Sequence, residues 1–280
     1  MIMNGIEHMP PLRAVIDAAG LRASKRFGQN FLMDLNLTRK IARAGGPFDG
    51  CDVLEVGPGP GGLTRALLLE GAEKVHAIEI DERCLGILSD IQKIDQRLVV
   101  HAGDALHINI ESQRPVRVVA NLPYNVGTLL LTNWLEQRPP GNPTLSYTLM
   151  FQKEVADRIT ARVGDHAYGR LAVLTQLTCS CRQLFDVPPG AFVPAPKVTS
   201  TVVRLEPLAE PGSDDLTMVS HITRLAFGQR RKMLRRSLAN LHPKLSDFLQ
   251  EIDVREEDRA EQVRPDQFAL LAKLVRQNPH

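Results

Sequence analysis

The sequence predicts an α/β protein in which a parallel sheet, flanked by helices, is followed by a small helical domain. Strand-like and helix-like runs alternate from Val53 to Phe151, which is typical of a parallel sheet. A glycine-rich turn joins the first strand to the first helix. The proline-containing stretch Glu206–Asp215 then reads as a linker. At 280 residues the chain is long enough for two domains, and we expect them at residues 1–207 and 208–280.

The elements of the first part follow from periodicity and turn residues. Pro10–Gly20 predicts a short helix, and Lys25–Leu32 predicts a loop that acts as a lid. A strand beginning at Val53 leads through the glycine turn into a helix at Leu63–Leu69. Further strands are expected at Val75–Ile80, Leu98–His101, Val116–Ala120 and Tyr147–Phe151.

The later elements are predicted in the same way. Thr128–Leu135 and Phe151–Arg162 have helical patterns. The apolar runs Leu171–Cys179 and Val198–Leu205 are interpreted as late strands that form an antiparallel pair. Beyond the linker, helices are expected at Leu216–Gln229, Lys232–Asn240, Pro243–Ile252 and Pro265–Gln277.

The turn after the first strand carries glycines at alternate positions, Gly57, Gly59 and Gly61. Glycine allows the backbone to approach a ligand closely, and the following helix places its N-terminus over the turn. Pro58 and Pro60, however, each lack the amide N–H that a pyrophosphate would bind. The turn therefore argues against a dinucleotide.

The next two strand ends carry acids. Glu79 follows the glycines by about 20 residues, where sheets of this kind bind ribose hydroxyls. Asp104 follows the third strand and is able to accept a hydrogen bond from a purine amine. Together these features indicate an adenosine with a tail other than phosphate, which fits S-adenosylmethionine. The alternative is an ordinary sheet with solvated acids in its loops.

Asn121, Leu122, Pro123 and Tyr124 end the strand that begins at Val116. The amine of adenine is a poor nucleophile, and acceptors aimed at its two hydrogens would draw the nitrogen toward tetrahedral geometry. The Asn121 oxygen and the Leu122 carbonyl are suitable acceptors, Pro123 stiffens the turn, and Tyr124 would stack on the ring. The alternative is a strand-end turn with a core tyrosine.

With three further motifs, the chain resembles the small-subunit ribosomal RNA adenine dimethyltransferases, the kasugamycin-sensitivity methylase family. The motifs are Lys25-Arg26-Phe27-Gly28-Gln29-Asn30-Phe31-Leu32, Phe192-Val193-Pro194-Ala195-Pro196-Lys197-Val198 and Gln229-Arg230-Arg231-Lys232-Met233-Leu234-Arg235-Arg236. The resemblance implies a Rossmann-like S-adenosylmethionine-dependent methyltransferase sheet with a small C-terminal helical domain. It implies dimethylation of the N6 amines of two adjacent adenosines near the 3′ end of that RNA.

The resemblance also implies roles for individual residues. The implied cofactor contacts are Asn30, Leu32, Gly57, Glu79, Asp104 and Asn121. Asn121, Leu122, Pro123 and Tyr124 would act on the target base, with the Phe192 ring stacked on its opposite face. The alternative for Phe192 is a ring that packs the loop onto the sheet. Val126-Gly127 departs from the family's usual Ile-Ser, which puts a hydroxyl near the site in doubt.

Charge is unevenly distributed, although 34 basic and 32 acidic residues give a net charge of only +2. Residues 230–236 are mostly basic and 251–261 mostly acidic. We expect a buried stripe of Phe227, Met233, Leu234 and Leu238 on a helix whose other face binds RNA; a solvated basic face is the alternative. The expected RNA contacts are Lys25, Arg26, Lys197, Arg230, Arg231, Lys232, Arg235 and Arg236.

The four cysteines have no zinc-like spacing, and the chain carries no evident export signal or membrane-spanning run. We expect a cytoplasmic monomer without a metal or membrane partner, acting on small-subunit RNA within an immature small ribosomal subunit. Two other functions remain open: a large-subunit adenine methylase of the macrolide-resistance kind, and a non-catalytic RNA-binding or assembly factor. Intact Asn121 and Tyr124 favour an enzyme.

Overall fold

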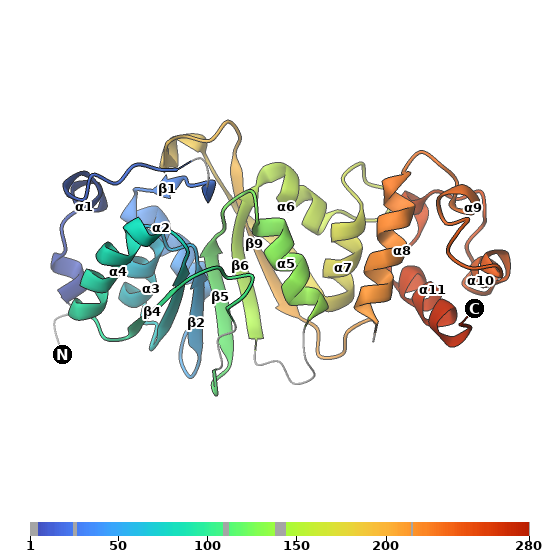
Figure 1. The fold of residues 1–280 in the computed structure, drawn as a ribbon, viewed down its shortest axis with the longest axis horizontal. Helices are drawn as coiled ribbons and strands as arrows, with labels where there is room; N and C mark the ends of the chain where they lie inside the picture. Colours follow the sequence, from blue (N-terminus) through green and yellow to red (C-terminus); the bar gives the residue numbers. More distant parts are fainter. Residues whose placement is uncertain (1–4, 25–26, 109–111, 138–143, 214, 280) are drawn as a thin grey trace. The chain divides into compact units, whose positions relative to one another are not determined.

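The computed structural model describes residues 5–24, 27–108, 112–137, 144–213 and 215–279, and a seven-stranded sheet dominates the fold (Figure 1). The strand order is β4-β3-β2-β5-β6-β9-β7. The pairs β2–β3, β3–β4, β2–β5 and β5–β6 are parallel, which confirms the predicted fold class. The strands are β2 Asp52–Val56, β3 Val75–Glu79, β4 Leu98–Ala102, β5 Val116–Asn121, β6 Thr144–Gln152, β7 Cys179–Val187 and β9 Ser200–Pro207.

Helices connect these strands, and a second, two-stranded sheet lies beside them. The helices are α1 Leu12–Ala18, α2 Leu35–Gly45, α3 Gly62–Leu69, α4 Glu82–Ile94, α5 Gly127–Glu136 and α6 Lys153–Thr160. The small sheet pairs β1, Phe31–Leu32, with β8, Phe192–Val193, in antiparallel register. It joins two of the sequence motifs that were far apart in the chain.

The order of the central strands positions the functional site. β3 and β4 lie on one side of β2, and β5 and β6 lie on the other. Where strand order switches in this way, the carboxyl ends of the central strands leave a crevice that can hold a ligand. Val53, Val75 and Val119 are fully buried, as strands covered on both faces require.

The prediction of a strand at Leu171–Cys179 is wrong. Residues Arg170–Thr178 form helix α7, and the strand that neighbours β9 is instead β7. Most of the circumference of α7 is buried, so the run shows no clear amphipathic period from which a helix could be predicted. Thr175 and Thr178 suit this burial because their hydroxyls donate to the carbonyls of Leu171 and Leu174, one turn earlier.

The chain divides into two compact units. The first takes in the described residues within 1–130, 140–153 and 183–204, and the second takes in those within 131–139, 154–182 and 205–280. The second unit thus holds α7 as well as α8 Leu216–Gly228, α9 Leu234–Ser237, α10 Leu245–Glu251 and α11 Pro265–Gln277. It is therefore larger than the segment 208–280.

The core of the second unit is aromatic. The Tyr168 and Phe268 rings, both fully buried, each lie 5.8 Å from the Phe227 ring, measured between centroids. The Tyr168 hydroxyl donates to the Val263 carbonyl at 2.9 Å.

No helix among the described residues combines the length and apolar character needed to cross a membrane.

Candidate active site

A cavity of about 310 Å³ lies at the carboxyl ends of β2, β3, β4 and β5. Residues from five segments that are separate in sequence meet around it. The expected site residues that line it are Asn30, Leu32, Gly57, Glu79, Asp104, Asn121, Leu122, Pro123 and Tyr124. The topology therefore brings the expected cofactor and target-base residues to one place.

The glycine turn forms one wall of the cavity. Gly57 and Gly59 adopt φ values of 69° and 56°, in the left-handed region that favours glycine. A Cβ at Gly57 would lie 3.3 Å from Cδ of Pro123, so a side chain there would crowd the neighbouring turn. The glycines thus permit the close approach between the β2 end and the β5 end that shapes the cavity.

Glu79 lies at the end of β3 with both carboxylate oxygens engaged. Oε2 accepts from the Gly59 backbone N–H and Oε1 accepts from the Asp81 backbone N–H, each at 2.8 Å. Burial raises the pKa of this carboxyl, and the backbone hydrogen bonds oppose that effect. Glu79 therefore ties the glycine turn to the β3 end, and its carboxylate keeps acceptor capacity for a ligand hydroxyl.

Asn121 ends β5 and contacts the segment that carries Asn30. Its Nδ2 donates to the Asn30 carbonyl at 3.3 Å, which leaves Oδ1 as the atom that can accept from an amine in the cavity. Tyr124 is held by a 2.6 Å hydrogen bond between its hydroxyl and that of Ser200. Burial raises the pKa of Tyr124.

Asp104 lines the cavity, and Gly127 follows the turn that carries Leu122. Asp104 uses Oδ1 to accept from the Leu106 backbone N–H at 2.9 Å, which fixes the carboxylate beside the cavity. Gly127, where the resembling family usually has serine, starts α5 against Leu122. A Cβ at Gly127 would lie 3.2 Å from Cβ of Leu122, so glycine allows tighter packing there than serine would.

Phe192 is not displayed toward a ligand, which corrects the expected stacking arrangement. Its side chain is only 2% exposed and packs in the hydrophobic core of the first unit. The pairing of Phe192 with Leu32 explains this burial, because it places Phe192 in a strand of the small sheet and not in an exposed loop. Lys197, five residues later, is exposed and does not line the cavity.

Glu55 is a cavity residue that sequence reasoning missed. It lies within β2, is 1% exposed, and accepts a 2.6 Å hydrogen bond from the Thr64 hydroxyl. Burial raises the pKa of its carboxyl to about 8, so the group is largely protonated at neutral pH. A second acid in the strand that starts at Asp52, two residues before Gly57, was the available signal.

A family model described as Ribosomal RNA adenine dimethylase matches residues 20–277. The chain belongs to this family. The match confirms the resemblance inferred from the motifs, and it shows that the protein is an enzyme that transfers methyl groups. Among the described residues of the dimethylase, no group of three or more His, Cys, Asp or Glu side chains could hold a metal ion.

Full-length relatives and solved structures agree with this assignment. The dimethylase is 52% identical to Ribosomal RNA small subunit methyltransferase A of Xanthobacter autotrophicus, covering 98% of this chain and 97% of the relative. It is 52% identical to the protein of that name from Agrobacterium fabrum, covering 98% and 100%. A dimethyladenosine transferase from Plasmodium falciparum superimposes with a TM-score of 0.74 at 28% identity, covering 88% and 98%. The 23S rRNA methyltransferase ErmE follows with 0.65 at 28% identity, covering 89% and 100%.

The basic run of the dimethylase lies in the second unit, and only part of it is helical. α9 covers Leu234–Ser237, whereas residues 230–232 form a turn, so the expected helix at Lys232–Asn240 and its single basic face are wrong. Backbone pairing explains the short helix, since Met233 bridges Arg259 and the Leu234 N–H donates to the Asp258 carbonyl. Met233, expected in the buried stripe, is 39% exposed.

The acidic stretch beside this run neutralises part of it. Arg230 pairs with Glu261 at 2.8 Å and Arg235 pairs with Glu257 at 3.6 Å. Arg231, Lys232 and Arg236 are exposed and form no ion pair within the described parts of the chain. Lys25 and Arg26 lie outside the described residues. The available cations of the run are thus fewer than its sequence suggested.

We expect the stability of a Glu55→Gln dimethylase, relative to the wild type, to depend on pH. Burial raises the folded-state pKa of Glu55 from 4.5 to about 8, so in this range the folded chain holds a proton that the unfolded chain has lost. The wild type therefore loses stability as pH rises through this window, by up to ~1.4 kcal/mol per pH unit, and glutamine removes that loss. Denaturant unfolding near both ends of the window measures it. A constant difference between the two chains would contradict a protonated Glu55.

Proposed function

We propose that the chain dimethylates the N6 amines of two adjacent adenosines near the 3′ end of small-subunit ribosomal RNA, with S-adenosylmethionine as methyl donor. The observation that carries the proposal is the position of Asn121 on the same cavity as Glu79 and Asp104. An amide acceptor for a target amine thus lies beside two acids suited to an adenosine. The names of the full-length relatives support the choice of RNA.

The cavity fits S-adenosylmethionine by the chemistry of its hydrogen-bond acceptors. Glu79 has free lone pairs for ribose hydroxyls, and Asp104 presents a carboxylate to a purine amine. The turn of Gly57 and Gly59 has no Cβ that would fill the space, and Pro58 and Pro60 make it a poor phosphate site. Asn30 and Leu32 would enclose the methionine part from the other side. When bound, this cofactor supplies an electrophilic methyl group on sulfur.

The residues of the chain then orient the nucleophile. The target adenosine leaves its RNA context and enters the cavity, where Tyr124 stacks on the base. Asn121 Oδ1 and the Leu122 carbonyl accept from the two amine hydrogens, which aligns the nitrogen lone pair with the methyl group. The nitrogen becomes acidic only after methylation, so its proton can pass to solvent without a strong general base. A second round requires the cavity to readmit the monomethylated base.

The proposal also includes where and in what state the enzyme works. The chain acts as a cytoplasmic monomer on an immature small ribosomal subunit. Light scattering of the purified chain tests the monomer. Methylation of small-subunit particles isolated at successive stages of assembly tests the preferred substrate.

Mass spectrometry of RNA after reaction with isotopically labelled S-adenosylmethionine tests the proposed function. We expect labelled dimethyladenosine at two adjacent positions near the 3′ end of small-subunit RNA. Label in large-subunit RNA would instead indicate an activity like that named for ErmE. The absence of label from either RNA, with a folded chain that binds RNA, would indicate a non-catalytic factor.

We expect Arg231→Ala with Arg236→Ala to weaken binding to small-subunit particles. Both side chains are exposed and have no ion-pair partner among the described residues, so they are available to phosphate. The slope of log affinity against log salt should shrink by about 0.7–0.9 for each phosphate interaction that the substitutions remove. Arg255→Ala is the matched control, because it removes an exposed charge from the same unit that already pairs with Asp258. Equal slopes for all chains would make the run a solvated surface.

A further inference from the structure

Residues 27–32, here called the strap, line the cavity along their whole length. The glycine turn and the end of β3 line the same cavity. The strap is therefore a wall of the site that comes from outside the central sheet, and what holds it in place affects anything bound there.

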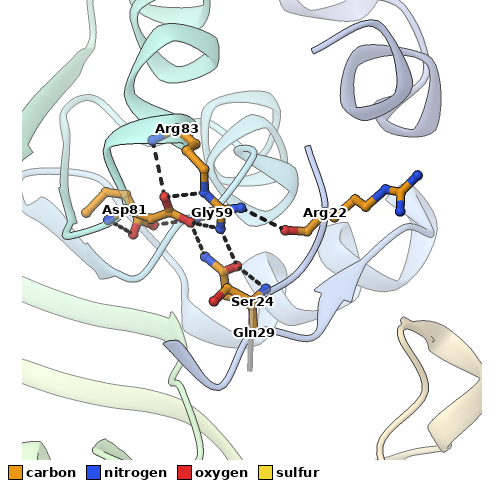
Figure 2. A network of polar contacts seen from close by, with 7 residues as sticks. Arg22, Ser24, Gln29, Gly59, Asp81 and Arg83 are labelled. Carbon is orange, nitrogen blue, oxygen red and sulfur yellow. Dashed lines mark hydrogen bonds and ion pairs between the residues drawn. The ribbon is translucent and has the colours of Figure 1, made fainter. Parts of the chain in front are cut away.

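A network of polar contacts fastens the strap to the end of β3 (Figure 2). Gln29 Nε2 donates to Asp81 Oδ2 at 2.7 Å, and Gln29 Oε1 accepts from the Ser24 backbone N–H at 2.9 Å. Arg83 binds the Asp81 carboxylate with Nε at 2.9 Å and Nη2 at 2.6 Å. Its Nη1 donates to the Arg22 carbonyl at 3.2 Å, and its Nη2 lies 3.5 Å from Gln29 Oε1.

The network continues into the expected ribose site. The Asp81 backbone N–H donates to Glu79, whose second oxygen accepts from Gly59. Asp81 is 2% exposed, and the hydrogen bond from Arg83 lowers its pKa to about 2. A buried carboxylate that is charged at neutral pH and bound by two nitrogens of a planar guanidinium makes a firm anchor. Figure 2 shows Gln29, Asp81 and Arg83 converging between the strap and the β3 end.

We propose that Gln29, Asp81 and Arg83 form a clasp that holds the strap closed over the cofactor and thereby sets how long S-adenosylmethionine stays bound. The clasp residues are positioning residues that act through the strap. This inference rests on the proposed function, since it takes S-adenosylmethionine as the occupant of the cavity.

The chain contains a matched control for the clasp. Arg97 binds Asp95, also two residues earlier, with Nε at 2.9 Å and Nη2 at 2.6 Å. Its Nη1 donates to the carbonyl of Ala72, three residues before β3, instead of to the segment that leads into the strap. Arg97→Ala therefore removes an equivalent ion pair without touching the strap.

Stopped-flow release of S-adenosylmethionine from the full chain tests the clasp. Arg83→Ala and Gln29→Ala should each speed release about three- to tenfold. This is less than the full loss of a charged hydrogen bond would give, because Arg83 is half exposed and solvent screens its charge. The double variant should release S-adenosylmethionine little faster than either single variant, because each single substitution already breaks the clasp. Arg97→Ala should release at the wild-type rate even if it melts at a lower temperature.

Two further readouts separate a clasp from a merely structural ion pair. The KM for S-adenosylmethionine should rise in Arg83→Ala and Gln29→Ala while the KM for RNA is unchanged. Amide hydrogen exchange in residues 28–32 of the cofactor-free chain should speed up in the same two variants and not in Arg97→Ala. Release at the wild-type rate from both clasp variants would overturn the clasp alone, whereas a wild-type chain that does not bind S-adenosylmethionine would contradict the proposed function.

Discussion

An Asn121→Ala chain should bind RNA nearly as the wild type does and, at saturating S-adenosylmethionine, turn over roughly a hundredfold more slowly, the scale seen when one preorganised polar group is removed. Asn121 Nδ2 is already bound to the Asn30 carbonyl, so its oxygen is the group that can orient the target amine. Single-turnover kinetics with saturating cofactor and RNA measure the effect. They isolate the methyl-transfer step from binding and product release.

Asn121→Asp is the matched control for this prediction. Aspartate replaces the donor to Asn30 with a charged acceptor oxygen, but it keeps an oxygen in the position of Oδ1. It should therefore retain more turnover than the alanine chain. Near-normal turnover in Asn121→Ala would remove the amine-orientation argument, and equal loss in both variants would assign the role to the Asn30 contact.

A Glu79→Ala chain should lose S-adenosylmethionine affinity by ~1.5–3 kcal/mol, which is roughly ten- to a hundredfold. The substitution removes the expected ribose acceptor and also releases the backbone N–H groups of Gly59 and Asp81. Calorimetric titration measures the affinity. Unfolding measured in parallel separates loss of the ligand contact from loss of the turn.

Glu79→Gln and Glu82→Ala are the controls. Glutamine keeps one acceptor oxygen, so it can hold only one of the two backbone N–H groups and should have an intermediate affinity. Glu82 is an exposed acid in the first turn of α4, and its removal should leave the affinity unchanged. Wild-type affinity in a folded Glu79→Ala chain would place the ribose elsewhere.

Sequence reasoning predicted the sheet and the placement of the cavity residues because both follow from local signals. β3, α5 and α11 begin and end within a residue or two of their expected limits. The glycines and acids at the strand ends were expected to bind one adenosine, the resemblance added Asn121 to that site, and carboxyl ends of parallel strands share one edge. The structure places Glu79, Asp104 and Asn121 on one cavity for that reason.

The failures come from interactions that local patterns do not contain. α7 is buried over most of its circumference, and neither this burial nor the position of β7 was visible in its own residues. Phe192 was expected in a displayed loop. Its pairing with Leu32 joins segments far apart in sequence, so neither segment alone reveals it. The basic run was expected on one helix with a free basic face. Its ion pairs with Glu257 and Glu261 depend on tertiary packing, which the run itself does not reveal.

The discontinuity of the second unit limits how this protein can be cut or recombined. α7 and Tyr168 belong to that unit, yet they precede β7 and β9 in the chain. A fragment that begins at residue 208 would lack the Tyr168 ring beside Phe227 and the hydroxyl that binds the Val263 carbonyl. Such a fragment would expose the aromatic centre of its own core. The C-terminal helices are therefore not a cassette that could be transplanted between methyltransferases by a single fusion; a working exchange has to carry the other segments of the unit, residues 131–139 and 154–182, with them.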